Sequence, residues 1–181
     1  MRRLVGSEMC IRDRSKIWEK ANKVIVISES IRDWLEKLNS SIKPTVIPYG
    51  VEIQEVSQKN KLANPTLGYL GKLNKNKGIE DLIDVYTKFQ AKENLSNFEL
   101  TLLIGGTGSE NYIKSLKNKI KDNNVKFLGY VEDRYSFFES IEIFVFPSYS
   151  EGLGLVLLEA MAHGVICITR DVTPMNSIVD N

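Results

Sequence analysis

The sequence predicts an α/β fold built on a parallel sheet with helices on both faces. Short apolar runs that resemble buried strands recur along the chain, and stretches with helical periodicity separate them. Each separating stretch is long enough for the crossover that two parallel strands need. Glycine-containing turns follow several of the runs. Because ligands on such sheets bind at the carboxyl ends of the strands, these turns are the first place to look for a site.

The first residues of the chain lack the apolar pattern of a helix or a strand. Residues 1–14 show no clear period and resemble a translated sequencing-adapter tract. They contain too few apolar residues in succession for a signal peptide. We therefore predict a non-native leader over 1–14, and we expect the natural start of the protein to be missing.

The next segment predicts a small strand–helix–strand unit. Ala21–Ile27 is a short buried strand, and Ser28 is a typical N-cap for a helix that begins near Glu29. Pro44–Val51 is a second strand that ends in a turn, and the polar, non-periodic segment Glu52–Pro65 predicts a linker. The expected apolar face of the helix is Ile31, Trp34, Leu35 and Leu38.

The remaining chain alternates strands and helices. The predicted strands are Leu67–Leu70, Glu99–Ile104, Val125–Leu128, Ile143–Phe146 and Val165–Thr169. Apolar residues at helical spacing define two helices, one with Ile79, Leu82, Ile83, Tyr86 and Phe89 and one with Tyr112, Ile113, Leu116 and Ile120. Asp133–Ser140 predicts a third helix with Asp133 as its cap, and Leu155–Ala162 predicts a fourth. This order predicts a parallel sheet covered on both faces.

The helix Leu155–Ala162 carries the most informative acid of the chain. It is apolar nearly all round, which is typical of a helix packed inside a domain. Glu159 lies within it, and an ionised carboxylate in apolar surroundings costs several kcal/mol unless it has a partner. His163 precedes Gly164 at the end of this helix, where a histidine caps the last turn, so we favour a structural role for it.

The turn before that helix predicts an anion site. Gly152 and Gly154 allow the backbone to approach a ligand, and the free N–H groups near Gly154 and Leu155 favour phosphate. Glu159, further along the helix, can accept hydrogen bonds from the two hydroxyls of a ribose. The spacing leaves another interpretation open, in which Glu151 only complements the helix N-terminus and Glu159 pairs with a lysine or arginine of a neighbouring element.

Two other turns carry weaker signals. Lys72 and Lys77 follow the strand Leu67–Leu70, where two ammonium groups can neutralise a diphosphate, although a solvated basic loop has the same pattern. Gly105–Glu110 contains three glycines in a strand-to-helix turn, which is common in compact turns without a ligand.

The string Glu151-Gly-Leu-Gly-Leu-Val-Leu-Leu-Glu159-Ala-Met-Ala resembles the two-glutamate signature of retaining glycosyltransferases of family 4. These enzymes have the GT-B architecture of two Rossmann-like domains. Gly71-Lys72-Leu73 with Lys77-Gly78 is similar to the family's Gly-Arg-Leu and Lys-Gly motif, with lysine in place of the usual arginine. That lysine lacks the bidentate fork of arginine. Phe127-Leu-Gly129-Tyr-Val131 resembles the segment that meets the nucleotide base.

The resemblance implies a role for each matching position. Lys72 and Lys77 hold the donor diphosphate and Glu151 contacts the donor sugar, so these three residues are the expected catalytic set. Glu159 holds the ribose. The expected nucleotide-sugar-binding residues are Gly71, Lys72, Lys77, Gly106, Val131, Glu151, Gly154, Leu155 and Glu159.

The resemblance also implies a domain plan and a reaction. Residues 15–62 correspond to the end of an acceptor domain and a linker, and residues 63–181 to a nucleotide-sugar-binding domain truncated at its carboxyl end. The expected reaction transfers a hexose, with retention, from a UDP-, GDP- or ADP-sugar to a glycan or lipid-linked acceptor. We expect no metal or cofactor, and a piece of this length to bind nucleotide but transfer little sugar. The alternatives are a noncatalytic nucleotide-binding module and a flavodoxin-like interaction domain whose glutamates form structural ion pairs.

Composition limits the remaining classes. The chain has 181 residues, 43% hydrophobic and 26% charged, with a formal net charge of +1. These values are ordinary for a globular domain and give no case for a nucleic-acid partner. Cys10 and Cys167 are too few for a disulfide scaffold. We therefore expect a cytoplasmic protein, with peripheral contact to the inner face of the membrane through the other domain as an option.

Overall fold

The structure is a computed structural model that describes residues 20–53, 65–91, 99–120 and 122–179. The chain divides into two compact units, Met1–Gly50 and Val51–Asn181. The predicted leader over 1–14 lies outside the described residues, and so does most of the predicted linker.

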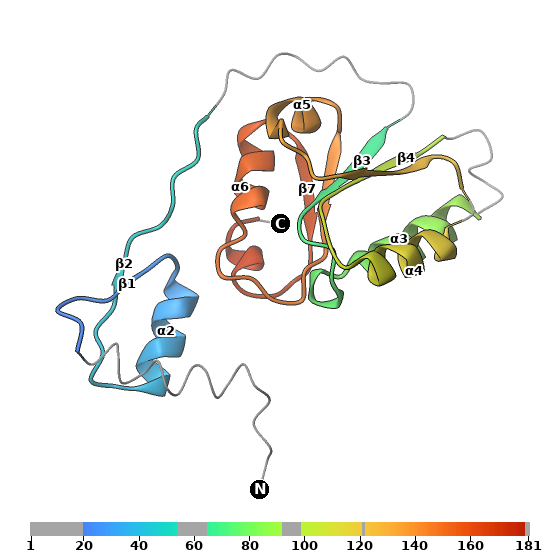
Figure 1. The fold of residues 1–181 in the computed structure, drawn as a ribbon. Coiled ribbons are helices and arrows are strands. Elements are labelled where there is room, and N and C mark those ends of the chain that lie inside the picture. The colour runs from blue at the N-terminus through green and yellow to red at the C-terminus, as the bar shows by residue number, and fades with distance from the viewer. Residues whose placement is uncertain (1–19, 54–64, 92–98, 121, 180–181) are drawn as a thin grey trace, which may run out of the picture. The chain divides into compact units, whose positions relative to one another are not determined.

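The first unit is a strand–helix–strand segment (Figure 1). Its strands β1 (Ile25–Val26) and β2 (Thr45–Val46) are parallel and shorter than predicted. The helix α2 (Glu29–Leu38) begins where predicted, because the Ser28 hydroxyl accepts a hydrogen bond from the Ile31 N–H group at 3.3 Å. Only Leu35 of its apolar face is buried, and Trp34 and Leu38 remain exposed within this unit.

The second unit contains a five-stranded parallel sheet with the order β5-β4-β3-β6-β7. From β3 the chain first moves outward to one side through β4 and β5, and then returns to form β6 and β7 on the other side. The strand order therefore reverses between β3 and β6, which is where ligands bind on such sheets. The strands are β3 (Thr66–Leu70), β4 (Thr101–Gly105), β5 (Val125–Gly129), β6 (Ile143–Phe146) and β7 (Ile166–Thr169).

Helices cover both faces of this sheet, as predicted (Figure 1). The helices α3 (Ile79–Gln90) and α4 (Glu110–Lys119) pack on one face, and α5 (Arg134–Glu139) and α6 (Leu155–Ala162) pack on the other. The described part of this unit also contains the 3-10 helices η1 (Lys75–Lys77), before α3, and η3 (Met175–Ser177), near the end.

The sheet separates two apolar cores. In β3 the buried side chains of Tyr69 and Leu70 point to opposite faces, because successive residues of a strand alternate. Tyr69 packs with Leu102 beneath α3 and α4, and Leu70 packs with Phe144 beneath α5 and α6. The two cores fix the sheet on both sides and so fix the turns at its carboxyl edge.

The prediction that α6 is packed inside the domain is wrong for the described structure. Leu157 and Ala160 are buried, but Leu155 is 38% exposed and Met161 is 41% exposed. The helix buries only the side that faces the sheet. Among the described residues, the neighbouring β7 pairs only with β6, so its outer edge is open. Cys167 on this strand is half-buried against the α5–α6 core. Burial raises the pKa of the Cys167 thiol to about 11.

Candidate functional site

The turns that follow β3, β4 and β5 are joined by backbone hydrogen bonds. The Gly71 N–H group donates to the Gly105 carbonyl at 3.0 Å, and the Gly106 N–H group donates to the Gly129 carbonyl at 2.7 Å. These bonds continue the sheet by one residue beyond its strands. They leave the side chains that follow each glycine at the carboxyl edge.

Two glycines are required where turns approach each other closely. Gly106 has φ 136°, and a Cβ there would lie 1.7 Å from the Gly71 carbonyl oxygen. Gly78 has φ 65°, and a Cβ there would lie 2.1 Å from the Pro147 carbonyl oxygen. Neither position accepts a side chain without a backbone shift. The glycine before α3 therefore brings the β3 turn against the β6 turn, which carries Glu151.

Lys77 and Glu151, two of the predicted site residues, meet at this contact. The Lys77 ammonium group lies 2.5 Å from a Glu151 carboxylate oxygen. The two side chains are only 23% and 13% exposed. The sequence separation of these residues is large, and the parallel order of β3 and β6 brings them together. A cation and an acid are thus held at the reversal point of the sheet.

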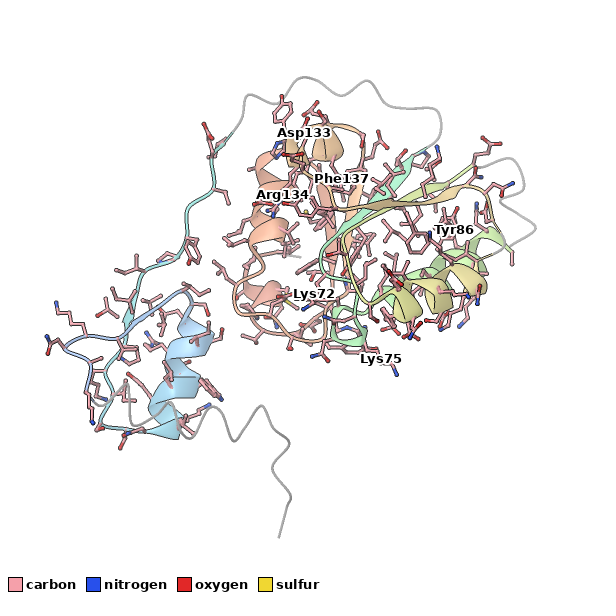
Figure 2. The ribbon with its side chains drawn as sticks, viewed as in Figure 1. Lys72, Lys75, Tyr86, Asp133, Arg134 and Phe137 are labelled. Carbon is pink, nitrogen blue, oxygen red and sulfur yellow. The ribbon has the colours of Figure 1, made fainter. Side chains whose placement is uncertain are left out.

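Lys72 lies elsewhere on the same edge. The buried Tyr69 hydroxyl donates to the Lys72 carbonyl at 3.0 Å and so fixes the backbone of the turn. Burial, with a smaller contribution from the Glu151 charge, raises the pKa of Tyr69 far above its usual range. The Lys72 side chain lines a cleft beside Lys75 and the start of α4, and Lys77 does not line this cleft. Figure 2 labels Lys72 and Lys75.

Arg170, directly after β7, stabilises the turn that carries Glu151. Its guanidinium pairs with Asp81 of α3, donates to the Pro147 carbonyl at 3.1 Å and lies 4.0 Å from the centre of the Tyr149 ring. The Tyr149 hydroxyl donates to Asp81 at 2.7 Å, and its N–H group donates to the Asn76 carbonyl at 2.9 Å. The Tyr149 bond and the Arg170 charge lower the pKa of Asp81. This cluster ties three elements around the site.

The start of α6 has the geometry that the sequence predicts for an anion site. Gly154 adopts a left-handed conformation with φ 78°, and a Cβ there would lie 3.5 Å from the Phe146 ring. The first bond of the helix runs from the Leu157 N–H group to the Gly154 carbonyl at 2.8 Å. The N–H groups of Leu155 and Val156 come before this bond and point out of the first turn. They remain a prediction for phosphate binding.

Glu159 has a protein partner. Both of its carboxylate oxygens lie within 3.0 Å of one guanidinium nitrogen of Arg134. Arg134 is the first residue of α5, and Figure 2 shows it beside Asp133 near α6. Asp133 caps α5 by accepting from the Ser136 N–H and hydroxyl groups, which lower the pKa of Asp133. The structure thus shows the pairing that the sequence left open as an alternative to ribose binding.

That ion pair is weak enough to be exchanged for a ligand. The Arg134 side chain is 55% exposed and the Glu159 side chain 28% exposed. Pairs with this exposure are worth roughly 0–1 kcal/mol, because water and salt screen them. A pair of vicinal hydroxyls that hydrogen-bonds to the Glu159 carboxylate can therefore displace Arg134.

His163 has the structural position that the sequence predicts. It is the C-cap of α6, its Nδ1–H group donates to the Glu159 carbonyl at 2.8 Å, and Gly164 follows with φ 65°. Its ring packs against Phe138 and Tyr135, with centroids 5.1 Å and 5.2 Å away. The imidazole therefore stabilises the end of the helix that carries Glu159.

The sequence did not single out Arg134, or the cluster of Asp81, Tyr149 and Arg170, as part of the site. Arg134 follows the Val131–Asp133 segment directly, and Arg170 directly follows a strand. Both arginines could have been found in the sequence as positively charged residues that closely follow a predicted strand. Their partners are distant in sequence and could not be assigned without the sheet order.

Neither a metal site nor a membrane span is found in the part of the chain that the structure describes. Among the described residues, no group of three or more His, Cys, Asp or Glu side chains is placed to hold a metal ion. None of the described helices is long and apolar enough to cross a bilayer.

The fold and the site define a Rossmann-like α/β protein with polar and charged side chains gathered at the carboxyl edge of its sheet. The family model described as glycosyl transferases group 1 matches residues 64–181. The chain belongs to that family. The match covers the second unit, including both glutamates of the predicted signature.

Known proteins support this assignment. The capsular polysaccharide biosynthesis glycosyltransferase CapM of Staphylococcus aureus is 32% identical over 84% of this chain and 44% of its own length. The O-antigen biosynthesis glycosyltransferase WclY of Escherichia coli is 27% identical over 91% of this chain and 47% of its own length. The chain thus spans about half the length of the curated relatives that it matches.

A solved structure agrees with the fold. S. aureus TarM, crystallised with fondaparinux, α-GlcNAc-glycerol and UDP, superposes with a TM-score of 0.80 and is 25% identical. The match covers 98% of this chain and 35% of TarM. The GT-B architecture that the two-glutamate string implies is therefore the architecture of its structural neighbours.

Proposed function

We propose that this chain is part of a retaining hexosyltransferase of cell-envelope polysaccharide biosynthesis, and that its second unit binds the nucleotide-sugar donor. The observation that carries the proposal is the contact of Lys77 with Glu151 at the reversal point of the sheet. Family membership and relatives in capsule and O-antigen synthesis support the same function. TarM was crystallised with UDP, which supports a nucleotide donor.

The site residues have complementary roles in this proposal. Lys77 exchanges its bond to Glu151 for the donor diphosphate, and Lys72 adds a second positive charge on the same edge. The N–H groups of Leu155 and Val156 receive the distal phosphate. Released from Lys77, Glu151 accepts hydrogen bonds from the sugar hydroxyls. These contacts stabilise the charge that develops on the diphosphate as the sugar leaves.

The nucleoside occupies the other side of the same edge. Glu159 exchanges Arg134 for the two ribose hydroxyls. The backbone near Val131 meets the base, and Gly71 and Gly106 allow the chain to pass close to the ligand.

The proposed reaction breaks the bond between the anomeric carbon and the β-phosphate oxygen. A bond forms between that carbon and an acceptor hydroxyl oxygen on the same face of the sugar. The hydroxyl proton passes to the departing phosphate oxygen. The acceptor is a glycan or a lipid-linked sugar, and no metal or other cofactor takes part. The enzyme acts in the cytoplasm, at the inner face of the membrane where its acceptor requires it.

Calorimetry with UDP, GDP and ADP on this chain tests the donor site. We expect one of the three nucleotides to bind and Glu159→Ala to weaken it about tenfold, because charge-assisted hydrogen bonds are worth roughly 1.5–3 kcal/mol. Asp84→Ala removes an exposed carboxylate from α3 and is the matched control. Absence of binding to a folded sample, or equal effects of the two substitutions, contradicts the proposal.

A second candidate is an interaction domain without a nucleotide site. The ion pair between Glu159 and Arg134 favours it, because the acid that is expected to hold the ribose already has a protein partner. The same calorimetry separates the two candidates. A nucleotide module without catalysis is distinguished by assaying the complete gene product for release of UDP or GDP from nucleotide sugars.

A further inference from the structure

A cluster of three polar side chains, which we call the Arg170 cluster, lies next to the ion pair of the candidate site. It consists of Asp81 in the first turn of α3, Tyr149 in the turn between β6 and α6, and Arg170 directly after β7. The Arg170 guanidinium pairs with the Asp81 carboxylate and lies over the Tyr149 ring, and the Tyr149 hydroxyl donates to Asp81. The bond to Asp81 raises the pKa of Tyr149, so its hydroxyl stays protonated. Each member of the cluster therefore contacts the other two.

The Arg170 cluster holds the backbone just before Glu151. The Arg170 Nε–H group donates to the Pro147 carbonyl at 3.1 Å, and the Tyr149 side chain is held by Arg170 and Asp81. Glu151 follows Tyr149 by two residues. Two residues of chain span at most roughly 7 Å, so the position of Tyr149 limits where Glu151 can lie.

The same turn is attached to the residues on either side of Lys77. The Tyr149 N–H group donates to the Asn76 carbonyl at 2.9 Å. Gly78 approaches the Pro147 carbonyl so closely that a Cβ there would lie 2.1 Å from its oxygen. Lys77 lies between these two contacts in the sequence. Both partners of the ion pair are thus carried by backbone segments that are bonded to each other.

Glu159, the acid proposed for the ribose, is held by a different element. Its partner Arg134 is the first residue of α5. Within the described part of the chain, Asp81, Tyr149 and Arg170 form no hydrogen bond or ion pair with α5 or α6. The two acids of the candidate site are therefore positioned by separate sets of contacts.

The Arg170 cluster lies at the surface and outside both apolar cores. The Asp81 and Arg170 side chains are 44% and 32% exposed, and Tyr149 is 49% exposed. Ion pairs with this exposure contribute little to the stability of the whole fold, which leaves local positioning as their main effect. Ile79 is fully buried at the start of α3, so the segment with Lys77 stays anchored without the cluster. The turn before α6 is the part that should move.

We propose that Asp81, Tyr149 and Arg170 are positioning residues for the sugar end of the donor site. This inference rests on the proposed function, in which Glu151 contacts the donor sugar. The cluster keeps the Glu151 carboxylate beside Lys77, where the sugar and the diphosphate of the donor meet. It takes no part in holding the ribose. Loss of the cluster should therefore weaken recognition of the sugar and leave recognition of the nucleoside intact.

Acetylation of this chain by acetic anhydride, followed by mass spectrometry, tests the positioning role without a ligand. Arg170→Gln should raise the labelling rate of Lys77 about threefold, because its ammonium group loses a fixed contact with Glu151. Lys75 lies in the same 3-10 helix and should keep its rate. Tyr86→Phe lowers stability at the other edge of the sheet, so it is the stability-matched control and should leave the labelling of Lys77 unchanged.

Calorimetry with UDP, GDP and ADP, each compared with its glucose conjugate, tests the assignment to the sugar end. For the nucleotide that binds, Arg170→Gln should lower the affinity for the glucose conjugate about fivefold, because hydrogen bonds from the Glu151 carboxylate are weakened. The affinity for the nucleotide itself should stay within twofold. Arg134→Gln acts at the ribose and should change both affinities by the same factor.

The outcomes separate this inference from the proposed function. Unchanged labelling of Lys77 in Arg170→Gln, or an equal rise in Tyr86→Phe, overturns the positioning role. Equal losses of affinity for the nucleotide and its glucose conjugate overturn the assignment to the sugar end, and so does a wild type that binds the nucleotide but not the conjugate. Absence of any nucleotide binding to a folded sample contradicts the proposed function, and the labelling result then still decides whether the cluster positions Glu151.

Discussion

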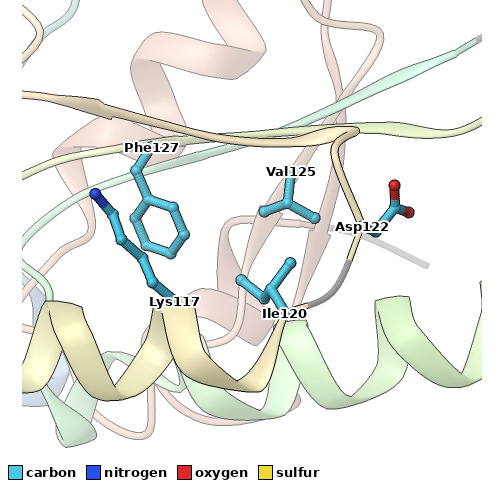
Figure 3. Close-up of a pocket in the computed structure, with 5 residues that line it drawn as sticks. All are labelled: Lys117, Ile120, Asp122, Val125 and Phe127. Carbon is cyan, nitrogen blue, oxygen red and sulfur yellow. The ribbon is translucent and has the colours of Figure 1, made fainter.

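Polar side chains at the amino ends of the strands have more hydrogen-bond partners than those at the carboxyl ends. At the amino edge, Asp122 accepts hydrogen bonds from Tyr86 at 3.0 Å, Gln90 at 3.3 Å and the Asn124 N–H group at 2.8 Å. The Tyr86 hydroxyl also contacts the Leu100 carbonyl at 2.6 Å. A small cavity of about 280 Å³ is found there (Figure 3), lined by Lys117, Ile120, Asp122, Val125 and Phe127.

At the carboxyl edge, the hydrogen bonding of the polar side chains is less complete. Glu151 and Glu159 each depend on one cation from a distant element. Three of the four buried side-chain atoms without a partner among the described residues lie at this edge, on Asn74, Tyr112 and Ser148. The amino-edge acid is satisfied by several neutral donors that need no ligand. The difference indicates that the amino edge serves stability and that the carboxyl edge is left open for binding.

The largest expected effect concerns the backbone of the carboxyl edge. Gly106→Ala should lower the free energy of unfolding by at least about 3 kcal/mol, because its Cβ would lie 1.7 Å from the Gly71 carbonyl oxygen and its φ is 136°. Gly129→Ala is the control. Its φ is 70°, but a Cβ there meets nothing within 4 Å, so we expect about 1 kcal/mol. Urea denaturation measures both, and equal losses would show that close packing of the turns is unimportant.

The next effect concerns the amino edge. Tyr86→Phe should lower the free energy of unfolding by about 1–2 kcal/mol, measured by urea denaturation, because it removes the one hydroxyl proton that lies between the Leu100 carbonyl and the Asp122 carboxylate. UDP affinity should stay within twofold. Tyr130→Phe removes a hydroxyl from a side chain that is exposed and should leave stability unchanged. A large loss of UDP affinity in Tyr86→Phe would remove the contrast between the edges.

A smaller effect tests whether Arg134 competes with the donor. Arg134→Gln should raise UDP affinity up to about fivefold, because an exposed ion pair worth at most about 1 kcal/mol no longer has to be broken. Arg134→Lys keeps the charge and should stay close to the wild type. Calorimetry with UDP shows directly whether the substitution raises or lowers the affinity. A fall in affinity for Arg134→Gln would make Arg134 a direct ligand and not a competitor.

The smallest effect is the pH dependence of the amino edge. The Asn124 N–H group, followed by Gln90 and Tyr86, lowers the pKa of Asp122 in the folded state. This contribution to stability is present above the unfolded pKa of about 3.9 and is lost as the pH falls through the lower folded pKa. The stability difference between wild type and Asp122→Asn should therefore shrink between pH 6 and pH 3. Urea midpoints at the two pH values measure it, and a constant difference would contradict this account.

Much of the fold follows from local sequence. The strand-like runs and the helical spacing predict β3 to β7 and α3 to α6, because apolar periodicity reports which side of an element is buried. Ser28 and Asp133 cap their helices as predicted, because a cap is decided within three residues. The exposure of Leu155 and Met161 was not predicted, because it depends on what packs against the outer side of α6.

The turns that carry the predicted site residues could be predicted, but the ion pairs that their side chains form could not. The turns after the strands are where the sequence places them, and Lys77 with Glu151 is one contact among its predicted residues. The bond between Glu159 and Arg134 needs the crossing of α5 and α6, which no local pattern encodes.

The three glycine turns at the carboxyl edge are connected through main-chain atoms alone. Every residue type except proline supplies the same N–H and carbonyl groups, so neighbouring side chains can be exchanged while this framework keeps its geometry. If the proposed donor site is correct, its specificity for a base or a sugar can be changed at positions such as Lys72, Thr107 and Tyr130. The glycines themselves must stay.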